Sequence, residues 1–242
     1  MLNLLINLEQ YKIAEKIGEG PYNIVYLVEK IETKELFAAK VSKVECKTTQ
    51  DQHSFFQSIT TFSGIQSPAL LKFIGFNLRN FSGEPFPTII TDYMPNGSLD
   101  NLLATNNTND RSKQYLILLG IAEGMKHLHN SGIIHRNLNP SNILLDKKLY
   151  PHVSDFGYSI ISDLLLSSID SNEISPYLAP EVITNNLYTF KSDVYSFSII
   201  AYHIITGKSI QKGERPNLTY IEDEDIRSFL SKCLSNEPSD RP

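Results

Sequence analysis

Polar residues that could do chemistry concentrate in two short stretches, "IIHRNLNPSNILL" at residues 133–145 and "DFG" at residues 155–157. The carboxylate of Asp155 is the oxygen ligand that a hard cation such as Mg²⁺ prefers, although aspartate is also common in turns. Asn137 and Asn139 carry amides, which can orient a hydroxyl group but can neither take a proton nor supply charge. The residue types alone therefore offer one carboxylate, which could bind a cation or end a turn, and a loop whose two asparagines can form hydrogen bonds but cannot act as a base.

A third stretch, "IGEGPYNIV" at residues 17–25, places two glycines in a turn between apolar segments. Gly18 and Gly20 would let backbone amides approach phosphate groups, whereas Asn23 adds bulk and stiffness to the same turn. An ordinary hairpin would also explain this stretch on its own.

The spacing of apolar residues predicts the elements that position these groups. β-branched segments predict two strands within 11–30, a third in 35–44, and two more around 70–78 and 87–94. Apolar residues at helical spacing predict one helix over 53–65. The first part of the chain is therefore expected to be a five-stranded lobe with a single helix.

The rest of the chain is predicted to be mostly helical. Residues 112–131 repeat apolar residues at helical spacing and stop at Gly132, and 191–207 read as a strongly apolar, buried helix. The polar, asparagine-rich stretch 104–113 is predicted to be a loop. A short hinge would join the two lobes, and a ligand would sit in a cleft between them.

Composition excludes several classes of partner. The 242 residues are 41% hydrophobic with a net charge of −5, and no basic block suggests nucleic acid or an anionic membrane. Cys46 and Cys233 show no metal-ligand spacing, which favours a reducing, cytoplasmic location. Residues 1–10 are too short to span a bilayer and do not resemble a signal peptide, so we expect a lead-in that packs on the first lobe.

The motifs together resemble the eukaryotic protein kinase family over residues 11–242. The phrases "PALLKFIGF", "TIITDYMPNGSL" and "KSDVYSFSII" are similar to its tyrosine-kinase-like branch. The resemblance implies an α+β, bilobal fold, with a lead-in at 1–10, an N-lobe at 11–93 and a C-lobe at 94–242.

The resemblance also implies a site for ATP and Mg²⁺. Lys40 in "FAAK" would contact the α- and β-phosphates, Thr91 would be the gatekeeper, and Asn142 and Asp155 would bind the metal. The other residues expected to contact the nucleotide are Ile17, Gly18, Gly20, Val25, Ala38, Asp92, Met94 and Leu144.

The resemblance fails at the positions that transfer the phosphate. The family pattern H-R-D-L-x-x-x-N has its catalytic base where this chain has Asn137, and Asn139 replaces a lysine that contacts the γ-phosphate. Ser58 aligns with the glutamate that should pair with Lys40, and Ile174 replaces a threonine of the same polar network. Glu45 or Asp51 remain alternative partners for Lys40.

Further expectations concern the scaffold. Only Ser209 to Gln211 separate "IITGK" from "KGERPNL", where the family has another helix. The sequence also ends without the family's last helix, and a truncated gene model would explain that second difference. Arg241 should pair with Glu181. The regulatory spine would comprise Phe62, Phe73, His135 and Phe156, with Asp193 at its base. In the presumed activation segment 158–178, an amphipathic helix is expected over 159–168.

Three functional hypotheses follow. The first is a pseudokinase-like module that binds ATP and Mg²⁺, transfers phosphate poorly or not at all, and acts on a protein partner such as another kinase. The second is a slow but active kinase for protein Ser/Thr or Tyr, because phosphoryl transfer depends mainly on positioning and charge. The third, a decayed chain that does not fold, is disfavoured by the regular apolar pattern.

Overall fold

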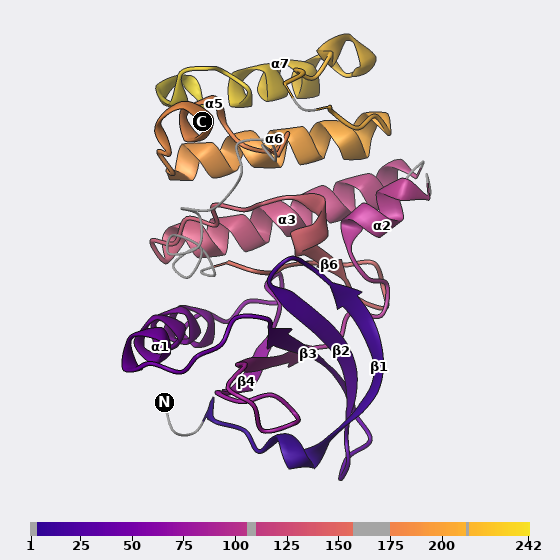
Figure 1. The fold of residues 1–242 in the computed structure, drawn as a ribbon. Coiled ribbons are helices and arrows are strands. Elements are labelled where there is room, and N and C mark those ends of the chain that lie inside the picture. Colours follow the sequence, from indigo (N-terminus) through magenta and orange to yellow (C-terminus); the bar gives the residue numbers. More distant parts are fainter. Residues whose placement is uncertain (1–3, 106–109, 157–174, 212) are drawn as a thin grey trace. The chain divides into compact units, whose positions relative to one another are not determined.

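A computed structural model describes residues 4–105, 110–156, 175–211 and 213–242. They form two compact units, Met1–Pro95 and Asn96–Pro242, which are described separately below (Figure 1).

The first unit is built on a five-stranded antiparallel sheet, as the sequence predicts. The strands follow the spatial order β1-β2-β3-β5-β4. The pairing register of β1 with β2 shifts twice, between Ile13 and Glu15 and between Lys16 and Gly18. The strands are β1 (Tyr11–Glu19), β2 (Asn23–Lys30), β3 (Leu36–Ser42), β4 (Phe73–Asn77) and β5 (Thr88–Asp92).

The two faces of this sheet carry different sets of side chains, because successive side chains along a strand point to opposite faces. Val28, Ala39 and Ile90 are fully buried on one face, where they pack with Leu8 and Tyr11 into a core. The next residues along the strands point to the opposite face and are only partly buried.

The helix α1 (Thr49–Ser63) packs on that opposite face. It begins with a capping box in which Thr48 and Asp51 exchange side-chain and backbone hydrogen bonds, four residues before the predicted start. The rings of Phe55 and Phe56 each lie 5.7 Å from the ring of Phe76 on β4. The predicted helix is therefore confirmed, with an earlier N-terminus.

The chain before β1 packs along β4. Leu5 forms a parallel bridge with Phe76, and the Ile6 amide donates to the Phe76 carbonyl at 2.9 Å. The Asn77 side chain donates in turn to the Ile6 carbonyl at 2.8 Å. This approach needs Gly75, because a Cβ there would collide with Ile6 Cγ2 and the Leu4 carbonyl.

The second unit consists mainly of helices around α6. Figure 1 shows α6 between α3 and α7, and ten of its seventeen residues are buried, so it forms the core of this unit. Cys233 is buried on α7, and burial raises the pKa of its thiol, as it does for Cys46 in the first unit. The helices are α2 (Leu99–Ala104), α3 (Arg111–Asn130), α5 (Pro180–Asn185), α6 (Phe190–Thr206) and α7 (Glu224–Cys233), with a hairpin of β6 (Ile143–Leu145) and β7 (Pro151–Val153).

Helix boundaries around residue 105 differ from the prediction. The short α2 was missed, although Ser98 and Asn101 form a capping box that marks its start. The stretch 104–113 is not entirely a loop, because α3 begins at Arg111 with Asp110 as its N-cap. The predicted end is confirmed: Gly132 follows α3 with a φ of 75°.

A buried ion pair joins the last residues of the sequence to α5. Arg241 donates to both carboxylate oxygens of Glu181, at 2.7 and 2.8 Å, and is 2% exposed. The pairing predicted for these residues is thus confirmed. Between α6 and α7, the described residues 207–211 and 213–223 contain no α-helix, only a 3₁₀ turn at Leu218–Tyr220.

We predict that Gly75→Ala destabilises the protein by about 1–3 kcal/mol, since the new methyl group must displace the segment that contains Ile6. Urea unfolding measures the effect. Gly18→Ala is the matched control, because its Cβ would meet Val25 at an ordinary 3.7 Å. Equal stability of the two variants would contradict the packing described for the lead-in.

Candidate functional site

Four of the residues predicted to contact a nucleotide share one face of the first sheet. Val25 pairs with Gly18 on one side and with Lys40 on the other, and Ala38 pairs with Thr91. Directly paired residues and residues two apart along a strand point the same way. The register therefore brings Val25, Ala38, Lys40 and Thr91 together on the face opposite the Leu8–Tyr11 core.

The remaining predicted contacts of this unit lie at its edges. Ile17 on β1 is 41% exposed, and Asp92 ends β5. Met94, just beyond β5, is 9% exposed. These positions stay predictions for nucleotide binding.

A lysine that sequence reasoning missed holds the glycine-containing turn. Lys43 Nζ donates to the Gly20 carbonyl at 2.9 Å, and its backbone amide donates to Tyr22 at 2.8 Å. Glu19 forms ion pairs with both Lys16 and Lys43, and their hydrogen bonds lower the pKa of this carboxyl to about 2. The turn is therefore tied to the end of β3.

In the second unit, one buried carboxylate organises the loop that contains Asn137. Asp193, at the start of α6, is 2% exposed. Its Oδ2 accepts from the His135 amide at 2.8 Å and from His129 Nε2 at 2.9 Å, while Oδ1 accepts from the Arg136 amide at 3.0 Å. These bonds hold Arg136 at a φ of 68°, a backbone conformation that is uncommon outside glycine.

His135 links this loop to the strand before Asp155. Its Nε2 lies 2.9 Å from the Ser154 carbonyl, so this nitrogen must carry the proton, while Nδ1 accepts from the Asn137 amide at 3.3 Å. Burial lowers the pKa of the fully enclosed imidazole, against the opposing charges of Asp193 and Asp155. His135 is therefore a neutral structural residue, not a base.

Three asparagines form a chain of amide hydrogen bonds on the loop. Asn139 Nδ2 donates to both the backbone oxygen and the side-chain Oδ1 of Asn137, at 3.0 Å each. Asn142 Nδ2 donates to the same backbone oxygen at 2.8 Å. Because Asn139 Oδ1 accepts from the Ser141 amide at 2.9 Å, both ends of its side chain are engaged.

The β6–β7 hairpin brings the two predicted metal ligands to one end of the hairpin. Ile143 pairs with Val153, and just beyond this pair the Ser154 amide and hydroxyl donate to the Asn142 carbonyl, at 2.9 and 3.0 Å. Asp155 follows with a φ of 60°. The Asn142 amide nitrogen is a donor, which leaves its Oδ1 as the atom for a cation. One carboxylate and one amide oxygen suit Mg²⁺, which takes its other ligands from phosphates and water.

Comparison with known proteins identifies the family. The model of the protein kinase domain matches residues 11–242. The chain belongs to the protein kinase family.

The relatives of this kinase domain include serine/threonine kinases. It is 38% identical over 167 residues, or 63% of the chain, to the RGS domain-containing serine/threonine-protein kinase A of Dictyostelium discoideum, of which it spans 15%. It is 35% identical over 227 residues to the cysteine-rich receptor-like protein kinase 8 of Arabidopsis thaliana, covering 90% of the chain and 32% of that relative. Cysteine-rich receptor-like protein kinase 25 of the same plant is 33% identical over 231 residues, with 92% and 32% covered. The chain therefore spans less than a third of the length of each of these relatives.

Membership of the family confirms the predicted fold class, a five-stranded lobe with one helix and a mainly helical lobe. Protein kinase domains bind ATP and Mg²⁺ in general and phosphorylate proteins. None of the helices in the described part of this kinase domain is both long and apolar enough to cross a bilayer.

Several predicted features of the kinase domain lie outside the described residues. They are Gly157 and Ile174, the activation segment up to residue 174 with its expected helix over 159–168, and the side chains of Ser58 and Phe62 on α1. Of the alternative partners for Lys40, Asp51 caps α1 and Glu45 forms an ion pair with Lys47 at 2.5 Å.

We predict that Lys43→Met speeds amide hydrogen exchange in the turn over residues 19–23, because the bond to the Gly20 carbonyl and one of the two ion pairs of Glu19 are lost. Mass spectrometry of exchange in the intact chain measures this. Lys34→Met is the control, since Lys34 pairs with Glu29 at an exposed hairpin. Unchanged exchange in the turn would mean that Lys43 does not hold it.

We predict that Asp193→Asn costs about 2–4 kcal/mol of unfolding free energy. The two backbone amides bind different oxygens of Asp193, so either orientation of an asparagine would aim its NH₂ group at a backbone N–H. Urea unfolding and exchange at residues 133–137 measure the change, with the exposed Asp100→Asn as the control. A variant as stable as the control would contradict the role given to this carboxylate.

Proposed function

We propose that this protein kinase domain binds ATP with Mg²⁺ but transfers phosphate poorly or not at all. It would act as a pseudokinase-like signalling module, of tyrosine-kinase-like ancestry, that presents a surface to a protein partner such as another kinase. The two cysteines, both buried as free thiols, support placing this module in the cytoplasm.

The nucleotide half of the proposal is supported by the positions of the predicted contacts. Lys40 shares a sheet face with Val25, Ala38 and Thr91, which suits a phosphate group and an adenine ring bound to that face. The end of the β6–β7 hairpin supplies Asn142 and Asp155 for a cation. When bound, Mg²⁺ would neutralise phosphate charge, and Asp155 and Asn142 would hold it.

One observation supports the proposed loss of phosphate transfer most directly: Asn139 Nδ2 donates a hydrogen bond to Asn137 Oδ1 at 3.0 Å. Asn137 lies where the family has its base and Asn139 where it has a lysine, so two neutral amides bind each other at these positions. An amide cannot take the proton of a substrate hydroxyl, and it cannot offset the charge of the transferring phosphate.

A slow but active kinase for protein serine or threonine is the second candidate. Asp193 and His135 hold the backbone of the loop by direct hydrogen bonds, so Asn137 is well placed to orient a hydroxyl group. Phosphoryl transfer relies mostly on positioning and charge, and loss of general-base assistance costs about 10²–10⁴-fold in rate. The serine/threonine kinases among the relatives favour this substrate class.

Two measurements test the proposal. A thermal-shift titration with ATP and Mg²⁺ should raise the melting temperature, because ligand binding stabilises the folded state by RT ln(1 + [ligand]/Kd). Asp155→Ala should remove the dependence of this shift on Mg²⁺. No shift with the parent chain would contradict nucleotide binding.

The second measurement is phosphate transfer to a generic protein substrate by the parent, Asn137→Asp, Asn139→Lys and the double variant. Asn137→Asp should raise the rate by about 10²–10⁴-fold. The effect of the double variant should differ from the product of the single effects, because the two side chains are in direct contact and their contributions are coupled. A parent already as fast as the double variant would overturn the pseudokinase proposal in favour of the active kinase.

A further inference from the structure

The glycine-containing turn at residues 19–23 lies at the end of the first sheet toward which the Lys40 row leads. Val25 pairs with Lys40, and the next pair on the same face, Asn23 with Ser42, lies two residues nearer the turn. That spacing is about 7 Å at the rise of a strand. A phosphate chain that is bound at Lys40 and extends toward the turn would therefore reach the pair of Asn23 and Ser42.

The backbone of this turn has few N–H groups left for phosphate oxygens. The Gly20 amide donates to the Asn23 carbonyl at 2.9 Å, so it already has a partner within the turn. Pro21 has no N–H group at all. Of residues 20–22, all of which the structure describes, only Tyr22 can still offer its amide. Because successive backbone N–H groups are what make a turn an anion-binding site, this turn is a poor one.

Polar side chains around the turn are also engaged. Lys43 Nζ donates to the Gly20 carbonyl at 2.9 Å and forms an ion pair with Glu19. Hydrogen bonds from two lysines lower the pKa of the Glu19 carboxyl to about 2, so a negative charge directly precedes the turn. The Ser42 hydroxyl donates to the Val44 carbonyl at 3.0 Å. This ammonium and this hydroxyl group therefore already have partners within the protein.

The side chain of Asn23 takes up room on the nucleotide face of the sheet. Asn23 and Val25 are two residues apart on β2, so their side chains point to the same face as Lys40. Asn23 is partly buried there, at a place that a glycine would leave empty. Its amide is neutral and cannot offset the charge of a terminal phosphate.

We propose that the nucleotide site does not distinguish ADP from ATP, because the turn does not hold the third phosphate. This inference rests on the nucleotide binding proposed above and specifies which nucleotides the site takes. The sheet face and Lys40 would bind the adenosine and the two phosphates that ADP and ATP share, while the third phosphate would stay in solvent. Occupancy of the site would then be independent of whether the nucleotide has been hydrolysed.

The probes are ATP and ADP, each titrated with Mg²⁺ into the full chain by isothermal titration calorimetry. We expect the two dissociation constants to lie within about threefold of each other, whereas one hydrogen bond to a charged phosphate would separate them by about tenfold or more. Lys40→Met should weaken the binding of both nucleotides equally, because Lys40 is expected to contact phosphates that the two share.

Two substitutions in the turn should create the missing preference for ATP. Pro21→Ala adds one N–H group, and alanine can adopt the backbone angles of proline without strain. Asn23→Gly removes the side chain from the nucleotide face. Relative to ADP, the double variant should bind ATP about tenfold or more tighter than the parent does. Pro68→Ala is the matched control, since this exposed proline lies in another turn, which the Leu70 amide closes on the Ser67 carbonyl at 3.1 Å.

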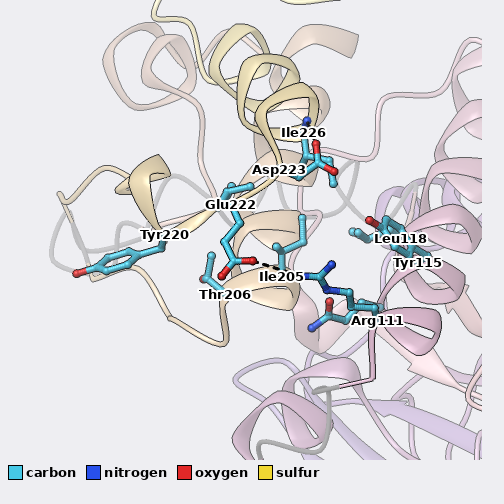
Figure 2. A pocket seen from close by; sticks show the side chains of 11 residues that line it. Arg111, Tyr115, Leu118, Ile205, Thr206, Tyr220, Glu222, Asp223 and Ile226 are labelled. Carbon is cyan, nitrogen blue, oxygen red and sulfur yellow. Dashed lines mark hydrogen bonds and ion pairs between the residues drawn. The ribbon is translucent and has the colours of Figure 1, made fainter.

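Binding of a nucleotide elsewhere on the chain must be distinguished from binding at this site. Arg111 lines a hollow of about 450 Å³ in the second unit, where it pairs with Glu222 at 3.3 Å (Figure 2). The carboxylates of Glu222 and Asp223 in the same hollow disfavour a polyanion. Arg111→Ala should therefore leave both dissociation constants unchanged. Urea unfolding verifies that each variant folds.

The possible failures are distinguishable. If the parent binds ATP tighter than ADP by more than the expected margin, this inference is overturned while the proposed nucleotide binding stands. The same holds if the double variant keeps the parent's ratio of the two dissociation constants, since Pro21 and Asn23 would then not set that ratio. Loss of binding in Arg111→Ala would move the nucleotide to the second unit, and no binding of either nucleotide would leave the site empty. Each of these last two results would overturn the proposed nucleotide binding together with this inference.

Discussion

The loop that carries the candidate chemistry depends on one buried carboxylate. Asp193 accepts two consecutive backbone amides, from His135 and Arg136, on different oxygens, and it also binds His129. A buried charge is costly to desolvate and is weak evidence of stability. The carboxylate of Asp193 instead fixes the conformation of the backbone. It holds Arg136 at a positive φ, and Asn137 follows with its amide bonded to His135.

The scaffold and the chemistry of this loop use different atoms. Asp193 and His135 hold the loop through backbone amides and carbonyls, so these contacts do not depend on the side chain at 137 or 139. Asn137 is exposed, whereas the neighbouring Leu138 is 1% exposed. Replacing a carboxylate and a lysine by two amides therefore changes the reactivity of the loop at little cost in its shape, because the amides satisfy each other.

Local patterns account for what the sequence could predict. β-branched segments located all five strands of the first sheet. The alternation of side chains along a strand also implies that Ala38 and Lys40, two residues apart, share a face. The short α2 has only six residues, too few for a helical period, and only its capping residues could have indicated it. The contacts of Lys43 and His129 could not be predicted from the sequence, because their partners lie 23 and 64 residues away along the chain. Such contacts follow from the fold and leave no local pattern.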